Sequence, residues 1–170
     1  MALSLKDIPD GSICFLDATI FYYHFVNHPP LSDDCSDLLA RIGAGAIKGV
    51  TSSVALTEAA HKVMLAEVIR QNRVPLQGLL SRIKKHPELL DHVAEHKQVY
   101  TLADNLDLSI EPITLHIMKR GAELSPQRHL LTNDVLILAV IETLGLTHIA
   151  TNDDDFDYVP GLNIFKPARI

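Results

Sequence analysis

The feature that most constrains the fold is a repeated pairing of a short apolar segment with a helical pattern. Five such segments occur, at residues 12–18, 49–54, 108–114, 147–152 and 162–167. They are short and nearly continuous rather than strictly alternating, which is typical of strands covered on both faces, as in a parallel sheet. The pattern predicts a three-layer α/β/α domain with a five-stranded parallel sheet.

Helical patterns lie between these segments, with apolar residues spaced three and four apart. They cover residues 33–46, 54–72, 76–84, 87–104, 114–122 and 133–145. The stretch from 54 to 105 holds more helices than one crossover between neighbouring strands needs. We therefore expect a single domain over residues 1–170, with an inserted helical arm at about 68–107 beside the sheet.

Composition indicates an ordinary globular protein in a reducing compartment. The chain has 170 residues, 47% of them apolar, and no segment approaches the ~20 uncharged apolar residues of a membrane span. Lys6, Asp7 and Asp10 stand where a signal peptide needs an apolar core. The two cysteines form no C-x-x-C pair. We expect a cytoplasmic protein that does not use the membrane.

The distribution of charge is more informative than its total. A net charge of −6 argues against a nucleic-acid partner, which normally selects for a basic face. Residues 62–97, however, contain seven Lys or Arg against four acids, a net charge of +3, which leaves −9 for the remainder. An acidic body with a basic arm suits a protein that holds cations and approaches phosphates, although ordinary solvated charges explain the same pattern.

Acidic residues recur where predicted strands end or the following helices begin. Asp17 closes the first strand, Glu58 lies early in the helix after the second, Asp134 opens the last helix, and Asp153 and Asp155 follow the fourth strand. Ligands of open parallel sheets collect at the carboxyl ends of the strands. We therefore expect these five carboxylates at one edge of the sheet.

Each acid also has a purely structural interpretation. Asp17 suits the N-cap of a helix that starts near Thr19, and Asp134 and Glu58 gain from the helix dipole. The run from Asp153 to Asp155 suits a turn. Together, however, converging carboxylates repel one another unless cations neutralise them.

The chemistry of such a cluster follows from its ligands. All-oxygen ligands without a nearby cysteine suit Mg²⁺ or Mn²⁺. Ions of this kind clamp a phosphodiester, activate a bound water and stabilise the departing oxyanion. Thr19 and Thr151 would then orient carboxylates or a water, or they are simply β-branched residues at strand ends.

Four motifs carry a resemblance to a known family: "FLDATIFYY", "SSVALTEAAHK", "NDVLILAVIETLG" and "HIATNDDDF". They resemble the PIN-domain family of Mg²⁺/Mn²⁺-dependent ribonucleases, which includes the VapC toxins. In that family an Asp ends the first strand and precedes Ser, Thr or Asn by two residues. A Glu follows on the helix after the second strand, an Asp opens a later helix, and T-x-D-x-D-F ends the next strand. By position these are Asp17, Thr19, Glu58, Asp134, Thr151, Asp153 and Asp155.

The resemblance implies a function and a set of site residues. It implies a metal-dependent endoribonuclease that hydrolyses RNA, in the manner of a toxin from a toxin–antitoxin pair. The implied catalytic residues are Asp17, Glu58, Asp134 and Asp153, and the implied metal ligands are these four with Asp155. Asp154 falls at the variable position of the motif. The family also implies an RNA substrate, homodimers and often an antitoxin partner, although this chain is longer than the compact toxins.

Other interpretations fit parts of the sequence. A non-catalytic PIN-like scaffold would keep the fold and bind RNA without cutting it; retention of all the acids argues against it. A response-regulator receiver would explain "FKP" at 165–167, but the third strand, "IEPIT", has no phosphoacceptor Asp. A haloacid-dehalogenase phosphatase needs D-x-D-x-T, and "DATIF" lacks its second Asp.

Overall fold

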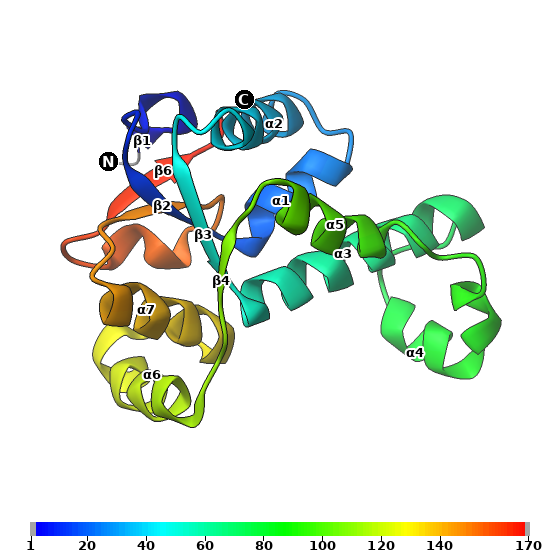
Figure 1. The fold of residues 1–170 in the computed structure, drawn as a ribbon. Helices are drawn as coiled ribbons and strands as arrows, with labels where there is room; N and C mark the ends of the chain where they lie inside the picture. The colour runs from blue at the N-terminus through cyan, green and yellow to red at the C-terminus, as the bar shows by residue number, and fades with distance from the viewer. Residues whose placement is uncertain (1–2, 169–170) are drawn as a thin grey trace.

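The computed structural model describes residues 3–168, which form a parallel β-sheet with helices on both faces (Figure 1). Six strands lie in the order β1-β6-β5-β2-β3-β4, and every neighbouring pair is parallel. The strands are β1 (Leu3–Ser4), β2 (Ile13–Leu16), β3 (Lys48–Ser52), β4 (Ser109–Glu111), β5 (His148–Ala150) and β6 (Asn163–Lys166). The predicted parallel α/β architecture is confirmed.

The predicted number of strands is wrong, because β1 adds a sixth strand at one edge. Leu3 pairs with Phe165 and Ser4 with Lys166 in parallel register. A two-residue strand is too short to show any periodicity in the sequence. It is held in place by the segment after it, where the buried side chains of Leu5 and Ile8 join the core.

Seven α-helices and three short 3₁₀ helices connect the strands of the described residues. The α-helices are α1 (Ala18–Phe25), α2 (Leu31–Gly43), α3 (Ser53–Asn72), α4 (Leu79–Lys85), α5 (His96–Asn105), α6 (Leu115–Arg128) and α7 (Thr132–Leu144). The 3₁₀ helices are η1 (Leu5–Asp7), η2 (Pro87–Leu90) and η3 (Asp155–Tyr158). Each crossover therefore returns the chain to the same edge of the sheet, so that the carboxyl ends of the strands lie together.

Alternate residues of the central strand enter two separate cores. Cys14 and Leu16 of β2 pack with buried residues of α1, α2, α3 and α5, whereas Phe15 packs with residues of α6 and α7. Side chains along a strand point alternately to opposite faces, so an apolar residue is needed at every position of a strand covered on both sides. This explains why the strands appear in the sequence as continuous apolar runs.

A third, smaller cluster lies beyond the sheet. The end of α3 extends away from the sheet in Figure 1 and carries α4 and η2 at its tip. Val68, Leu79 and Val93 form the buried centre of this cluster. We call residues 73–95, which include α4 and η2, the α4 lobe.

The helix predicted over residues 87–104 is wrong in one respect, because it is broken. Residues 91–95 form a turn between η2 and α5. The carboxylate of Glu67, which is only 3% exposed, accepts hydrogen bonds from the backbone N–H groups of Ala94, at 3.0 Å, and Glu95, at 2.8 Å. These bonds satisfy donors at the start of α5, so a buried acid of α3 fixes where the helix begins.

Within residues 3–168, no helix combines the length and apolar character that crossing a membrane requires.

Candidate metal centre

Asp17 is the most buried of the five predicted acids. It follows β2, caps the N-terminus of α1 and is 5% exposed. Its Oδ2 atom accepts three hydrogen bonds: from the backbone N of Thr19 at 3.2 Å, from Thr19 Oγ1 at 2.7 Å and from Thr151 Oγ1 at 2.8 Å. Burial raises the pKa of Asp17, and the two threonine hydroxyls act against that rise. The carboxylate is therefore held rigidly in a site that disfavours an uncompensated charge.

The two threonines also tie the loop after β5 to the start of α1. Thr19 Oγ1 accepts from the backbone N of Asn152 at 2.9 Å, and Thr151 Oγ1 accepts from the backbone N of Asp153 at 2.9 Å. Each hydroxyl thus donates to Asp17 and accepts from the loop. The orienting role considered from the sequence is what these hydrogen bonds provide, and it positions Asp153 relative to Asp17.

The three consecutive acids of this loop have different surroundings. Asp153 Oδ1 accepts from the backbone N of Asp155 at 2.9 Å, which shapes the turn into η3. Asp154 instead forms an ion pair with Lys166 Nζ at 2.6 Å, and Asp157 forms another at 2.5 Å. Lys166 on β6 is only 7% exposed. The middle acid therefore anchors the loop to the sheet, a role that its variable position in the motif did not indicate.

Glu58 faces the site from the second turn of α3 and already has two partners. Its carboxylate forms an ion pair with Lys62 Nζ at 2.8 Å and accepts from Asn133 Nδ2 at 3.1 Å. Burial acts to lower the pKa of Lys62, but the hydrogen bond and charge of Glu58, with the charges of Asp17 and Asp153, outweigh it and raise the pKa. Lys62 is therefore a resident cation at the edge of the acidic site.

The pKa of Asp134 is affected by the charges of the other predicted acids. Asp134 lies in the first turn of α7, and burial, followed by repulsion from Asp153, Asp155, Asp17 and Glu58, raises its pKa to about 6. All four other predicted acids thus act on it. The structure therefore brings the five predicted residues to one edge of the sheet, with negative charge in excess of what Lys62 neutralises.

The chemistry of this set fits a hard divalent cation. The donors are carboxylate oxygens, and the repulsion on Asp134 is the kind of cost that a bound cation removes. In the part of the chain that the structure describes, however, no group of three or more His, Cys, Asp or Glu side chains is placed so that it could hold a metal ion.

A cavity of about 450 Å³ lies beside the acids, between α1 and α3. Thr19 and Lys62 belong to its wall, and each is hydrogen-bonded to a site carboxylate. Tyr22 and Tyr23 supply aromatic rings, with Leu65, Ala66, Ile69 and Leu76 completing the lining. The hydroxyl of Tyr23 accepts from Asn152 Nδ2 at 3.2 Å, so this wall is tied to the acidic loop.

Sequence reasoning missed three polar residues of the site: Lys62, Asn133 and Lys166. Lys62 follows Glu58 by four residues on one helix, a spacing that places two side chains side by side and was a usable signal. Asn133 and Lys166 had no such signal. Their partners, Glu58 and Asp154, are distant in the sequence and meet them only in the tertiary structure.

Solved structures share this fold at low sequence identity. A toxin–antitoxin complex from Klebsiella pneumoniae aligns with 92% of this chain and 99% of its own, at 16% identity and a TM-score of 0.56. Mycobacterium tuberculosis VapC20, described as a toxin that cleaves the sarcin–ricin loop, aligns over 86% and 95%, at 14% identity and a TM-score of 0.57. Rickettsia felis VapBC2, solved with a promoter DNA fragment, aligns over 91% and 98%, at 20% identity and a TM-score of 0.50.

At these identities the solved structures show the fold alone. A comparison with curated protein sequences found no significant match. The profile of the family described as "PIN domain", by contrast, matches residues 14–162, a range that contains all five predicted acids and both threonines. The resemblance carried by the four sequence motifs is confirmed, and this chain belongs to the PIN domain family.

Proposed function

We propose that this protein is a Mg²⁺- or Mn²⁺-dependent endoribonuclease that hydrolyses phosphodiester bonds of RNA. The observation that carries the proposal is the buried Asp17 carboxylate, held by two threonine hydroxyls at a sheet edge where four further acids repel one another. Such an arrangement costs stability and is typical of a functional site rather than of a scaffold.

Asp17, Glu58, Asp134, Asp153 and Asp155 are the residues that would hold the metal. Bound there, the ion supplies charge neutralisation, an activated water and stabilisation of the leaving oxygen. The three hydrogen bonds to Asp17 all go to Oδ2, so they keep the carboxylate oriented with Oδ1 outside this network. Asp134 is partly buried, and burial together with the neighbouring carboxylates raises its pKa to about 6, a charge cost that a bound cation would remove.

The cavity beside the acids supports a nucleic-acid substrate. Its aromatic wall, Tyr22 and Tyr23, offers a stacking surface for an unpaired base. Lys62 lies between this wall and the acids and would meet a backbone phosphate there. A base in the cavity would place the adjoining phosphodiester beside the carboxylates.

The acidic site also favours a second candidate, an RNA-binding scaffold that does not cut. The specific observation is that Glu58 is already occupied by Lys62 and Asn133, while the described residues form no group able to hold a metal. In this alternative Lys62 replaces the cation permanently. The two candidates differ in whether RNA is cleaved.

Two of the structurally similar proteins suggest a partner for this chain. The Klebsiella structure is a toxin–antitoxin complex, and the Rickettsia structure is VapBC2 bound to a fragment of its promoter. We extend the proposal to a cognate antitoxin partner and a homodimer, which the family resemblance implies, and to a cytoplasmic location. With such an antitoxin, this chain would be the toxin of a toxin–antitoxin pair.

The deciding experiment is an RNA cleavage assay with defined metals. Purified protein should cut single-stranded RNA with Mn²⁺ or Mg²⁺ and stop when EDTA is added. Asp17→Asn and Asp153→Asn should abolish cleavage while circular dichroism and thermal unfolding show a folded protein. Cleavage that persists in both variants would indicate another site or a contaminating nuclease. Wild-type protein that binds RNA but never cuts it, with any metal, would establish the scaffold instead.

A further inference from the structure

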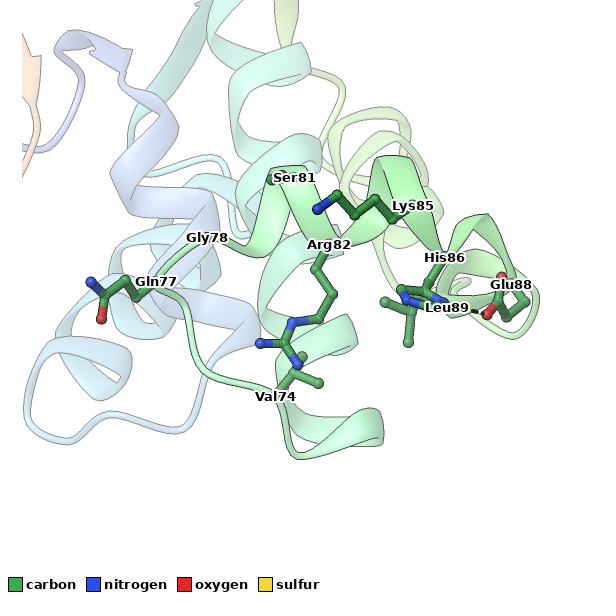
Figure 2. Close-up of a pocket in the computed structure, with 9 residues that line it drawn as sticks. All are labelled: Val74, Gln77, Gly78, Ser81, Arg82, Lys85, His86, Glu88 and Leu89. Carbon is green, nitrogen blue, oxygen red and sulfur yellow. Dashed lines mark hydrogen bonds and ion pairs between the residues drawn. The ribbon is translucent and has the colours of Figure 1, made fainter.

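A second cavity, of about 550 Å³, opens in the α4 lobe at the opposite end of α3 from the acids. Figure 2 shows its wall, in which the Arg82 side chain reaches toward Val74 while Lys85 extends back along α4 toward Ser81. His86 and Glu88 close one end, where His86 Nδ1 and Glu88 Oε1 are hydrogen-bonded at 3.1 Å. The cavity therefore combines exposed cations with the hydroxyl of Ser81 and an apolar surface formed by Val74 and Leu89.

The cations of the α4 lobe form no ion pairs, whereas most of those elsewhere in the described residues do. Within residues 3–168, most Lys and Arg side chains outside the lobe are held in ion pairs, including Lys6, Arg41, Lys62 and Lys166. Apart from Lys48 and Lys119, the cations without an ion pair in that range all fall between residues 73 and 97. They are Arg73, Arg82, Lys84, Lys85 and Lys97.

Local structure does not account for this concentration of charge. Arg82, Lys84 and Lys85 lie in the last turn of α4, where cations interact favourably with the helix dipole, but a dipole effect requires no cavity. Among the residues lining the cavity, Glu88 is the single acid, and Arg82 and Lys85 are the cations. The cations therefore outnumber the acid, and the lining of the pocket carries a net positive charge on a protein whose total charge is −6.

We propose that this pocket binds the phosphodiester backbone of the RNA at a distance from the cleavage site; the inference rests on the proposed function. Arg82 presents a planar fork of donors that matches a phosphate, and Lys85 supplies a second cation. Ser81 adds a hydroxyl donor, while Val74 and Leu89 form an apolar wall against which a ribose can pack. Contacts of this kind position a nucleic acid without reading its sequence.

The length of α3 determines how far the RNA must extend. Glu58 and Asn72 lie fourteen residues apart on this helix, about 21 Å at ~1.5 Å per residue. At ~3.4 Å per stacked nucleotide, that separation corresponds to about six nucleotides. A stacked RNA of about this length can occupy the acidic site and the α4 lobe together, so the pocket favours longer substrates over short ones.

The test compares charge removal in the pocket with charge removal elsewhere. Arg82→Ala/Lys85→Ala is the test variant, and Lys48→Ala/Lys119→Ala removes the same charge from exposed positions on β3 and α6. Binding of a fluorescein-labelled 20-nucleotide RNA is measured by anisotropy in EDTA over a range of NaCl concentrations. The pocket variant should bind about tenfold more weakly, and its salt slope should be shallower by about 1.4, the value for two lost contacts to a single strand.

Cleavage kinetics separate this inference from the proposed function. With Mn²⁺, the pocket variant should raise KM for the 20-nucleotide RNA with little change in kcat, and should cut a tetranucleotide as well as the wild type. Arg82→Lys/Lys85→Arg should restore most of the binding. Equal losses in the pocket and control variants, or none in either, would overturn the inference while RNA cleavage by the wild type upholds the nuclease. Wild-type protein that neither binds nor cuts RNA would overturn both.

Discussion

Thr151 Oγ1 donates a 2.8 Å hydrogen bond to Asp17 Oδ2, although 134 residues separate the two in the chain. Thr151 follows β5 and Asp17 follows β2, and these strands are neighbours in the sheet. The bond joins the two carboxyl ends from which three of the five acids project. It therefore fixes the position of Asp17 relative to Asp153 and Asp155.

Removing this hydroxyl should impair cleavage more than folding. Thr151→Val keeps the shape of the side chain but leaves Asp17 without one of its three bonds, and the backbone N of Asp153 without its acceptor. Loss of residues that orient ligands typically lowers activity or metal affinity about 10- to 100-fold. We expect that range in kcat/KM, measured with Mn²⁺. Thr151→Ser, which retains the hydroxyl, serves as the control and should keep most activity; equal loss in both would show that packing, not the hydrogen bond, matters.

The charge of Asp134 should make the metal-free protein less stable as pH rises. Its pKa is raised to about 6 from an unfolded value of 3.8, so the folded state binds the extra proton between these pH values. The contribution of Asp134 to the free energy of unfolding is therefore greatest below about pH 4 and is lost as the pH rises through 6. Urea unfolding in EDTA should show a smaller decrease between pH 4.5 and 7 for Asp134→Asn than for the wild type. A steeper decrease in the variant would contradict the repulsion at Asp134.

A bound metal ion should offset the loss of stability that the charge of Asp134 causes. Adding Mn²⁺ at pH 7 should raise the Tm of the wild type, because a ligand that binds only the folded state stabilises it by about 2.7 kcal/mol at a hundredfold excess over its Kd. Asp134→Asn and Asp17→Asn should show little or no rise in Tm, as followed by thermal scans with and without Mn²⁺. A rise as large in both variants as in the wild type would place the ion elsewhere.

The three acids after β5 should respond differently to the same substitution. Asp153→Asn should abolish cleavage. Asp154→Asn should retain cleavage but lower the free energy of unfolding, because Asp154 is paired with the buried Lys166. Because Asp154 is largely exposed and the Asp157–Lys166 ion pair remains, we expect that loss to be about 1 kcal/mol or less. Cleavage assays and urea unfolding on the same preparations measure both effects, and loss of cleavage in Asp154→Asn would refute the separation of roles.

Lys62 should compete with the metal for Glu58. Replacing it by Met keeps the aliphatic length but removes the cation that neutralises Glu58. The Mn²⁺ concentration that gives half-maximal cleavage should then fall several-fold, since the acids lose a resident positive charge. Lys119→Met, on the exposed surface of α6, controls for net charge. An unchanged metal requirement would show that Glu58 is not a ligand.

The sequence by itself determined the parallel α/β architecture and the edge at which the acids meet. Continuous apolar runs specify strands buried on both faces, and parallel strands must bring their carboxyl ends together. The alternation of strands and helices was therefore enough to place Asp17, Glu58, Asp134, Asp153 and Asp155 on one edge of the sheet. Local spacing also placed Asp17 at a helix N-cap, as the hydrogen bond from the backbone N of Thr19 confirms.

Three features could not be predicted from the spacing of apolar residues in the sequence and depend on the tertiary structure. The sixth strand is too short to leave a periodic signal and exists only by pairing with β6. The break before α5 depends on Glu67, a buried acid more than twenty residues away in the chain. Asp154 acquired a structural role from Lys166 on another strand. Each of these features depends on a partner distant in sequence, and hydrophobic periodicity carries no information about which polar groups meet once the chain has folded.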